Sequence, residues 1–149
     1  QLNKPPTRPY GMINEVVIRG AKLWVANVHL TPVVGPPPIG FPITEPFRLR
    51  ESRHLTGAVE SLTEPVIAVG DFNSFWPAPT CLHMCRRWRD SRAAGSGPRH
   101  GTRPTYGIPF VIDHIFVRGN IRIRDYRVIL GGGSDHRAVI AALDVPIQR

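Results

Sequence analysis

A chain of 149 residues is long enough for one domain with a sizeable core, and its 42% hydrophobic and 20% charged residues are ordinary for a globular protein. No apolar run approaches the roughly 20 residues of a membrane span, and the polar start at Gln1 lacks the apolar core of a signal peptide. The net charge of +8 would attract polyanions such as nucleic acid or phosphorylated molecules, although a solubilising basic surface explains it equally well.

Two β-strands joined by a tight turn are expected near the start of the chain. Residues 12–19 and 22–28 are rich in β-branched and aromatic side chains, and Gly20 lies between them. The second strand delivers His29 to its end, and residues 31–46 follow as a proline-rich loop. Such a loop is stiff and partly extended rather than freely flexible.

A helix is predicted for residues 44–62. Thr44 serves as its N-cap, and Pro46 falls in the first turn, where a missing N–H costs little. Apolar side chains recur at helical spacing and predict a buried stripe of Leu55, Val59 and Leu62. The charged side chains of this segment are expected to face water: Arg48, Arg50, Glu51 and Arg53.

A buried strand is expected directly after this helix. Residues 65–69 form a short continuous apolar run, which is typical of a strand covered on both faces. A second helix is predicted for residues 78–88, and a basic loop rich in Gly, Pro and Ser for residues 91–104. Three further strands complete the chain at residues 110–117, 122–128 and 138–143. This order of elements indicates one mixed α/β domain with much antiparallel pairing.

The buried strand ends in the sequence Gly-Asp-Phe-Asn-Ser at residues 70–74. Asp71 and Asn73 are two positions apart in an extended segment, so their side chains can point the same way. A carboxylate beside an amide suits a group that activates water next to one that stabilises charge. In isolation, however, the same residues more often form an Asx turn that closes a strand.

Asp113 lies within an otherwise apolar strand, where an unpaired charge is costly. His136, in Ser-Asp-His at residues 134–136, is its natural partner. A carboxylate that accepts a hydrogen bond from one imidazole nitrogen sets the tautomer and favours the protonated ring. Such an imidazolium can donate to a phosphoryl oxygen, and a purely structural hydrogen bond is the alternative. We expect His114 to face away from Asp113 and to lack a partner of this kind.

Other polar residues fall near these segments. Asp135 supplies a hard oxygen ligand suited to Mg²⁺ or Mn²⁺, and the three glycines at residues 131–133 permit close approach of the backbone. His29 ends a different strand and can join the same rim, although a lone histidine is more often a satisfied core or loop residue. Six arginines can either follow phosphates or form a solvated face: Arg86, Arg87, Arg89, Arg92, Arg99 and Arg103.

Taken together, these segments resemble the endonuclease/exonuclease/phosphatase superfamily, which has the deoxyribonuclease I-like fold. The matching segments are residues 7–9 (Thr-Arg-Pro), 27–30 (Asn-Val-His-Leu), 70–73 (Gly-Asp-Phe-Asn), 112–115 (Ile-Asp-His-Ile) and 134–136 (Ser-Asp-His). Each motif alone is weak, but five in matching order and spacing cover nearly the whole chain. The resemblance implies the C-terminal part of a four-layered α/β/β/α sandwich with a mixed, mostly antiparallel sheet.

The resemblance also implies a role for each matching residue. His29 contacts the phosphate or assists the leaving group, Asp71 aligns and deprotonates the attacking water, and Asn73 stabilises the transition state. Asp113 orients His136, which stabilises the phosphoryl oxygens. These implied roles agree with the chemistry of the residue types, because phosphoryl transfer needs positioned water and fixed donors around developing charge.

A divalent metal, Mg²⁺ or Mn²⁺, is the cofactor that the resemblance implies. Asp135 is then a metal ligand, and Arg8 corresponds to a substrate-contacting arginine. The implied function is a metal-dependent hydrolase of phosphate esters, of the nuclease, phosphodiesterase or phosphatase type, acting on a nucleic-acid or phospholipid-type substrate. We expect a monomer.

The family's first half supplies an Asn and a Glu that hold the metal, and nothing upstream of Arg8 resembles either segment. We therefore expect residues 1–149 to be a single domain without its N-terminal half, with weak or absent activity on its own. The alternative function is a catalytically incomplete fragment that binds polyanions through its basic surface. Residues 25–32 and 112–117 look most like bacterial members, some of them VanJ-type and membrane-anchored, so an anchor upstream of Gln1 is an expectation.

Overall fold

A computed structural model describes residues 10–35, 40–95, 100–105 and 108–147. The elements in chain order are β1 (Gly11–Ile18), β2 (Ala21–His29), α1 (Gly40–Ala58), β3 (Val66–Asp71), α2 (Pro79–Cys85), β4 (Arg89–Asp90), the 3-10 helix η1 (Ser91–Ala94), β5 (Arg103–Thr105), β6 (Ile108–Phe110), β7 (Asp113–Arg118), β8 (Arg122–Ile129) and β9 (Ala138–Asp144).

The main sheet has five strands in the order β1-β2-β3-β7-β4. Strands β2 and β3 are parallel, because α1 carries the chain from the end of one to the start of the other, and the remaining neighbours are antiparallel. Two smaller antiparallel pairs, β5-β6 and β8-β9, complete the fold. The predicted mixed, mostly antiparallel α/β architecture is therefore confirmed.

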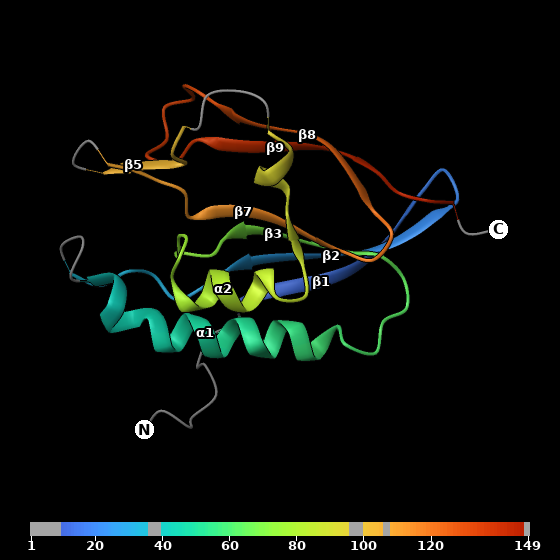
Figure 1. Cartoon of the computed structure of the whole chain (residues 1–149), viewed down its shortest axis with the longest axis horizontal. Coiled ribbons are helices and arrows are strands. Elements are labelled where there is room, and N and C mark those ends of the chain that lie inside the picture. Colours follow the sequence, from blue (N-terminus) through green and yellow to red (C-terminus); the bar gives the residue numbers. More distant parts are fainter. Residues whose placement is uncertain (1–9, 36–39, 96–99, 106–107, 148–149) are drawn as a thin grey trace.

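The sheet is covered by α1 and α2 on one face, and the β8-β9 hairpin lies on the other side (Figure 1). The hydrophobic core fills the space between the helices and the sheet, where side chains of β2, β3 and β7 meet those of α1 and α2. Its fully buried members include Ala26, Leu30, Val59, Val66, Ala68, Phe72, Met84 and Phe116. No helix of the described residues is long and apolar enough to cross a membrane.

Helix α1 begins earlier and ends earlier than its sequence predicts, at Gly40 rather than Thr44 and at Ala58 rather than at residue 62. Pro46 consequently lies inside the helix, whereas Pro42 occupies the first turn. Thr44 therefore lies inside the helix and does not cap it, and its hydroxyl oxygen accepts a hydrogen bond from the Arg48 guanidinium one turn later. Of the proline-rich loop expected at 31–46, residues 40–46 are helical and residues 36–39 lie outside the described residues.

The prediction that all charged residues of this helix face water was wrong for two of them. Arg48 is fully buried and Glu51 is 4% exposed, whereas Arg53 is exposed. Arg48 forms an ion pair with Glu45 of the same helix, and Glu51 accepts hydrogen bonds from Thr31. Helical periodicity predicts these residues at the surface because buried charges are rare, and the partner that both share, Thr31, lies on a segment distant in sequence.

The strand predicted at 110–117 is two strands, β6 and β7, separated at residues 111–112. Thr102 causes the break, because its hydroxyl oxygen accepts the N–H groups of Ile112 (3.0 Å) and Asp113 (3.1 Å) that would otherwise join a strand ladder. The carbonyl of Ile112 accepts from Phe72. The predicted basic loop at 91–104 likewise contains η1 and the start of β5, while residues 96–99 are outside the described part.

Candidate active site

Three polar side chains stand in a row across the end of the main sheet. His29 on β2 pairs with Asp71 on β3, and Asp71 pairs with Asp113 on β7. Side chains of directly paired residues share one face of a sheet. The alternate positions, such as Val28 and Ala68, pack into the helix-covered core. The row therefore lies on the face away from α1 and α2.

The end of β3 and the turn after it have an unusual backbone on both sides of Asp71. Gly70 has φ +130°, and a Cβ at this position would overlap the carbonyl oxygen of Val28 on the neighbouring strand. Asn73 has φ +48°, in the left-handed region that Asn tolerates better than most residues. Its buried amide donates to the Leu30 carbonyl (3.1 Å), so this side chain ties the end of β3 to the end of β2.

The two carboxylate oxygens of Asp71 have different surroundings. Oδ1 accepts the backbone N–H of Asn73 at 2.7 Å. Oδ2 lies 3.7 Å from Nε2 of His29 and 4.0 Å from Nε2 of His136. These gaps exceed a direct hydrogen bond and are suited to a bridging water or ligand oxygen. Burial raises the pKa of Asp71, the Asn73 N–H opposes the shift, and the neighbouring Asp113 charge adds to it.

His136 and Asp113 form a close pair. Nδ1 of the imidazole lies 3.0 and 3.1 Å from the two Asp113 oxygens, so the ring donates from Nδ1 and turns Nε2 toward Asp71. The His136 backbone N–H donates to the Ser134 hydroxyl (3.1 Å). The next residue, Arg137, donates its N–H to the Thr102 carbonyl (2.7 Å). Thr102 thus holds both the Asp113 and the His136 segments.

The structure brings five of the predicted residues together at one end of the central strands: His29, Asp71, Asn73, Asp113 and His136. Asp135 is nearby in sequence but its side chain is 73% exposed and pairs with Arg103 at 3.2 Å. Among the described residues, the group with ligand atoms close enough to hold a metal ion is Asp71, Asp113 and His136, within 4.8 Å of one another. Arg8 lies outside the described residues.

Several of the six arginines make structural contacts. Arg89 donates to the carbonyls of Gly119 and Ile121, Arg92 pairs with Asp90, and Arg87 pairs with Glu60 at the surface. Arg99 lies outside the described residues. With Arg103 on Asp135, the structure therefore places the guanidinium of four of the six on a protein partner.

Sequence reasoning missed a second imidazole–carboxylate pair behind the site. His114 does face away from Asp113, as predicted, but it is fully buried and has partners. Its Nε2–H donates to the Ser74 carbonyl (2.9 Å), and Nδ1 lies 3.5 Å from Asp90 on β4. Burial disfavours the charged ring, but the interactions with Asp90 and Cys81 outweigh it and raise the pKa of His114 to about 10.

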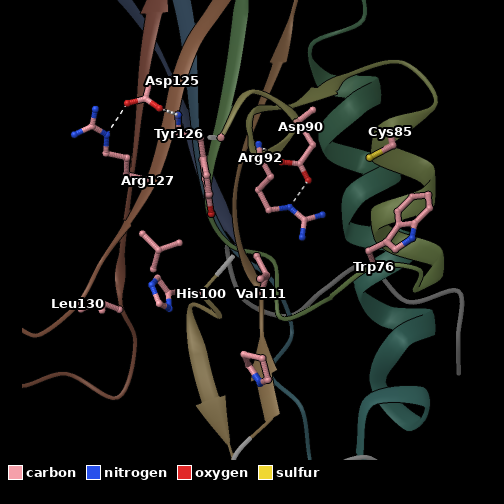
Figure 2. Close-up of a pocket in the computed structure, with 14 residues that line it drawn as sticks. Trp76, Cys85, Asp90, Arg92, His100, Val111, Asp125, Tyr126, Arg127 and Leu130 are labelled. Carbon is pink, nitrogen blue, oxygen red and sulfur yellow. Dashed lines mark hydrogen bonds and ion pairs between the residues drawn. The ribbon is translucent and has the colours of Figure 1, made fainter. Parts of the chain in front are cut away.

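A cavity of about 790 Å³ lies beside the site, at the β4 edge of the sheet (Figure 2). Asp90 and Arg92 line one side and Tyr126 of β8 the other, with Trp76 and His100 at the rim. Burial raises the pKa of Tyr126 to about 12, so its phenol is neutral. None of the residues in the polar row lines this cavity, so it neighbours the candidate site.

Comparisons with known proteins agree with this arrangement. The sequence model of the Endonuclease/Exonuclease/phosphatase family matches residues 4–136. No curated protein matches the chain in sequence. Three similar solved structures are the mannosyl-6-phosphatase Bt3783 of Bacteroides thetaiotaomicron VPI-5482 (19% identity, TM-score 0.62), the human Nocturnin catalytic domain with bound sulfate (17%, 0.67) and a humanized D. rerio TDP2 (18%, 0.70).

These structures are longer than the chain. The match with Bt3783 covers 85% of this chain and 52% of the Bt3783 chain. The corresponding values are 91% and 52% for Nocturnin, and 89% and 59% for TDP2. At these identities the likeness shows the fold. The VanJ-type assignment and the division into a single domain without its N-terminal half stay predictions.

Proposed function

The chain belongs to the endonuclease/exonuclease/phosphatase family, and on that premise we propose that it is a divalent-metal-dependent hydrolase of phosphate esters. The observation that carries the proposal is the row of His29, Asp71 and Asp113 at the end of three neighbouring strands. His136 pairs with Asp113 and lies 4.0 Å from Asp71. A purely structural Asx turn would explain Asp71 and Asn73 but not two imidazoles directed at the same carboxylate oxygen.

Asp71 acts as the general base in this proposal. Its Oδ1 is held by the Asn73 N–H, so Oδ2 is the oxygen that accepts a proton from the attacking water. Burial raises its pKa, which makes the carboxylate a stronger base than a solvated one. Asn73 holds one amide hydrogen on Leu30 and offers its second to the reacting phosphoryl group.

His136 stabilises the charge that develops on the phosphoryl oxygens. Asp113 accepts from Nδ1 and so fixes both the tautomer and the orientation of the ring, leaving Nε2–H as the donor toward the substrate. His29 reaches the same oxygen of Asp71 from β2 and is 68% exposed, as a residue that contacts the leaving group requires. Both imidazoles thus approach the reacting phosphate from opposite sides of Asp71.

The carboxylates fit a divalent cation, because Asp71 and Asp113 offer close oxygens of the kind that Mg²⁺ and Mn²⁺ prefer, although Asp135 lies outside this group of close ligand atoms. We propose Asp135 as a further ligand, because its carboxylate is exposed and its ion pair with Arg103 is of the surface kind that contributes little stability. When bound, the ion polarises the phosphoryl oxygens and offsets their developing charge.

The substrate proposed is a phosphate ester of the nucleic-acid or phospholipid type. The net charge of +8 supports an anionic substrate. Two of the similar structures are a mannosyl-6-phosphatase and a catalytic domain with a bound sulfate anion. Because the chain spans about half of such structures, an activity of the whole protein is part of this proposal.

Hydrolysis of bis-p-nitrophenyl phosphate, DNA and a lipid pyrophosphate, each with Mg²⁺ and with EDTA, tests the proposal. Residues 1–149 are expected to have weak or absent activity on their own, so the assay uses the full-length protein, for which we expect Mg²⁺-dependent turnover of at least one substrate. Asp71→Asn should lower kcat by roughly 100- to 10,000-fold, because the general base is lost. The matched control is Asp144→Asn, which changes an exposed carboxylate of β9 that pairs with Arg124 of β8 and should keep the wild-type rate. Wild-type turnover by Asp71→Asn would refute the assignment.

A further inference from the structure

The inner face of α1 carries a group of buried polar residues that the proposed mechanism does not use. Glu45, Arg48 and Glu51 fall at spacings that place them on one side of the helix, and all three are under 10% exposed. Arg48 lies at the centre, with Nε and Nη2 each 3.0 Å from Oε2 of Glu45. We call these three residues the α1 polar face.

Glu45 reaches the segment that follows the catalytic turn. Its carboxylate accepts the Ser74 hydroxyl at 3.3 Å and the backbone N–H of Thr80 at 2.6 Å. Ser74 directly follows Asn73, and Thr80 lies in the first turn of α2. A single carboxylate thus fixes both ends of the segment that leaves Asp71 and Asn73.

Glu51 and Arg48 reach the segment that follows His29. Glu51 accepts the backbone N–H of Thr31 at 2.8 Å and its hydroxyl at 2.6 Å. Arg48 donates to the Thr31 carbonyl at 3.3 Å. Between His29 and Thr31, Leu30 donates its N–H to the Asp71 carbonyl and accepts from Asn73. The two catalytic segments are therefore held to each other and to the same helix.

Energetics argue that this group does more than pack. A buried ion pair loses hydration, and apolar residues of similar volume often give equal or greater stability at such a position. Burial lowers the pKa of Arg48, and the charges of Glu45, Glu51 and Asp71 oppose that shift, so the guanidinium also lies within electrostatic reach of the general base. What the polar group adds over apolar packing is a fixed hydrogen-bond geometry on two loops.

We propose that Glu45, Arg48 and Glu51 are positioning residues, which set the separation between His29 and the Asp71–Asn73 turn for catalysis. The inference rests on the proposed function of the site, although the contacts themselves do not. None of the three touches the substrate. Displacement of a catalytic group by about 1 Å can cost roughly 100-fold in rate, so loosening the clamp should lower kcat more than it raises KM.

The test compares Glu45→Gln with Glu60→Gln, which are the same isosteric change at a buried and at an exposed Glu–Arg pair (Glu60 with Arg87, 2.9 Å). In Glu45→Gln an NH₂ group replaces one acceptor oxygen, so the Thr80 N–H contact on Oε1 and the Arg48 contacts on Oε2 cannot both persist. We expect kcat to fall about 10- to 100-fold with KM changed less than threefold. Glu60→Gln should leave both constants unchanged.

Amide hydrogen exchange supplies a readout that does not need turnover. We expect Glu45→Gln to accelerate exchange at residues 72–80, with smaller change at Thr31 and none in β1 or β8. If Glu45→Gln does not fold, Ser74→Ala removes the same contact from the loop side, with a severalfold loss of kcat expected. If the wild-type protein hydrolyses no phosphate ester, the proposed function fails and exchange alone decides the positioning role. Equal effects of Glu45→Gln and Glu60→Gln, or exchange accelerated uniformly, would overturn it.

Discussion

Strand β7 carries two histidine–aspartate pairs, one on each side, from the adjacent residues Asp113 and His114. On the open side, Asp113 holds His136 at 3.0 Å, and both side chains keep some contact with solvent. On the core side, His114 lies 3.5 Å from Asp90 and its ring is fully buried, stacked on Phe116. The two pairs share their chemistry and differ in access.

That difference separates catalysis from support. The open pair leaves Nε2 of His136 directed at Asp71, where a substrate can reach it. In the buried pair, Nε2 of His114 donates to the carbonyl of Ser74, one residue beyond the catalytic turn. We infer that accessibility, and not residue type, decides which imidazole reacts. Substitutions on the open side should cost rate, and substitutions on the core side should cost stability first.

The largest effect is expected from His136→Ala on the open side. Loss of the donor that faces the phosphoryl oxygens should lower kcat by roughly 100- to 1,000-fold. Stability should change by less than about 1 kcal/mol, because the ring is at the rim of the fold. Steady-state kinetics and urea unfolding of one preparation check both numbers. His54→Ala, at an exposed position on α1, is the matched control and should alter neither. Unchanged kcat in His136→Ala would remove this residue from the mechanism.

On the core side, His114→Gln should destabilise the fold by about 3 kcal/mol, because it leaves the Asp90 carboxylate with Arg92 alone in a buried setting. Gln can still donate to the Ser74 carbonyl, so the loss reports mainly on the charge pair. Urea unfolding measures it, with His54→Gln as the exposed control. A stability equal to wild type would show that the buried pair contributes nothing net.

The core pair also predicts a pH dependence. The pKa of His114 is raised from 6.5 to about 10 in the fold, so the charged ring stabilises the folded state fully below pH 6.5. That contribution is lost as the pH rises from 6.5 to about 10. The melting temperature should fall across this window in the wild type and less in His114→Gln. Burial also raises the pKa of Cys85 to about 11, so this thiol causes a loss of stability at high pH in both proteins. That loss cancels in the difference between the two melting temperatures. Parallel curves for the two proteins would contradict the assignment.

Much of this arrangement can be predicted from the sequence. The strand ends at His29 and Asp71 follow from apolar runs that stop at polar residues, and alternation along β7 correctly turns His114 away from Asp113. The mixed, mostly antiparallel sheet follows from the order of strands and helices. These features are local, or depend on periodicity that a single segment carries.

The missing parts depend on contacts between distant segments. Arg48 and Glu51 read as surface residues because their partner Thr31 lies at the end of another strand. Asp90 went unrecognised as the partner of His114 because β4 has only two residues and no pattern of its own. Helical and strand periodicity predicts burial from the spacing of apolar residues. It therefore cannot identify a buried charged residue whose partner lies on a distant segment of the chain.

One paired measurement tests the division between the two sides of β7 most directly. Asp113→Asn and Asp90→Asn are the same isosteric change on the open and the core pair, and each protein is assayed for kcat with Mg²⁺ and for its free energy of unfolding. We predict that Asp113→Asn loses roughly 100-fold or more in kcat, because the His136 tautomer is no longer fixed, with stability within about 1 kcal/mol of wild type. Asp90→Asn should lose about 3 kcal/mol while its folded fraction retains most of its kcat. A loss of kcat that simply follows the loss of stability in both variants would contradict the account.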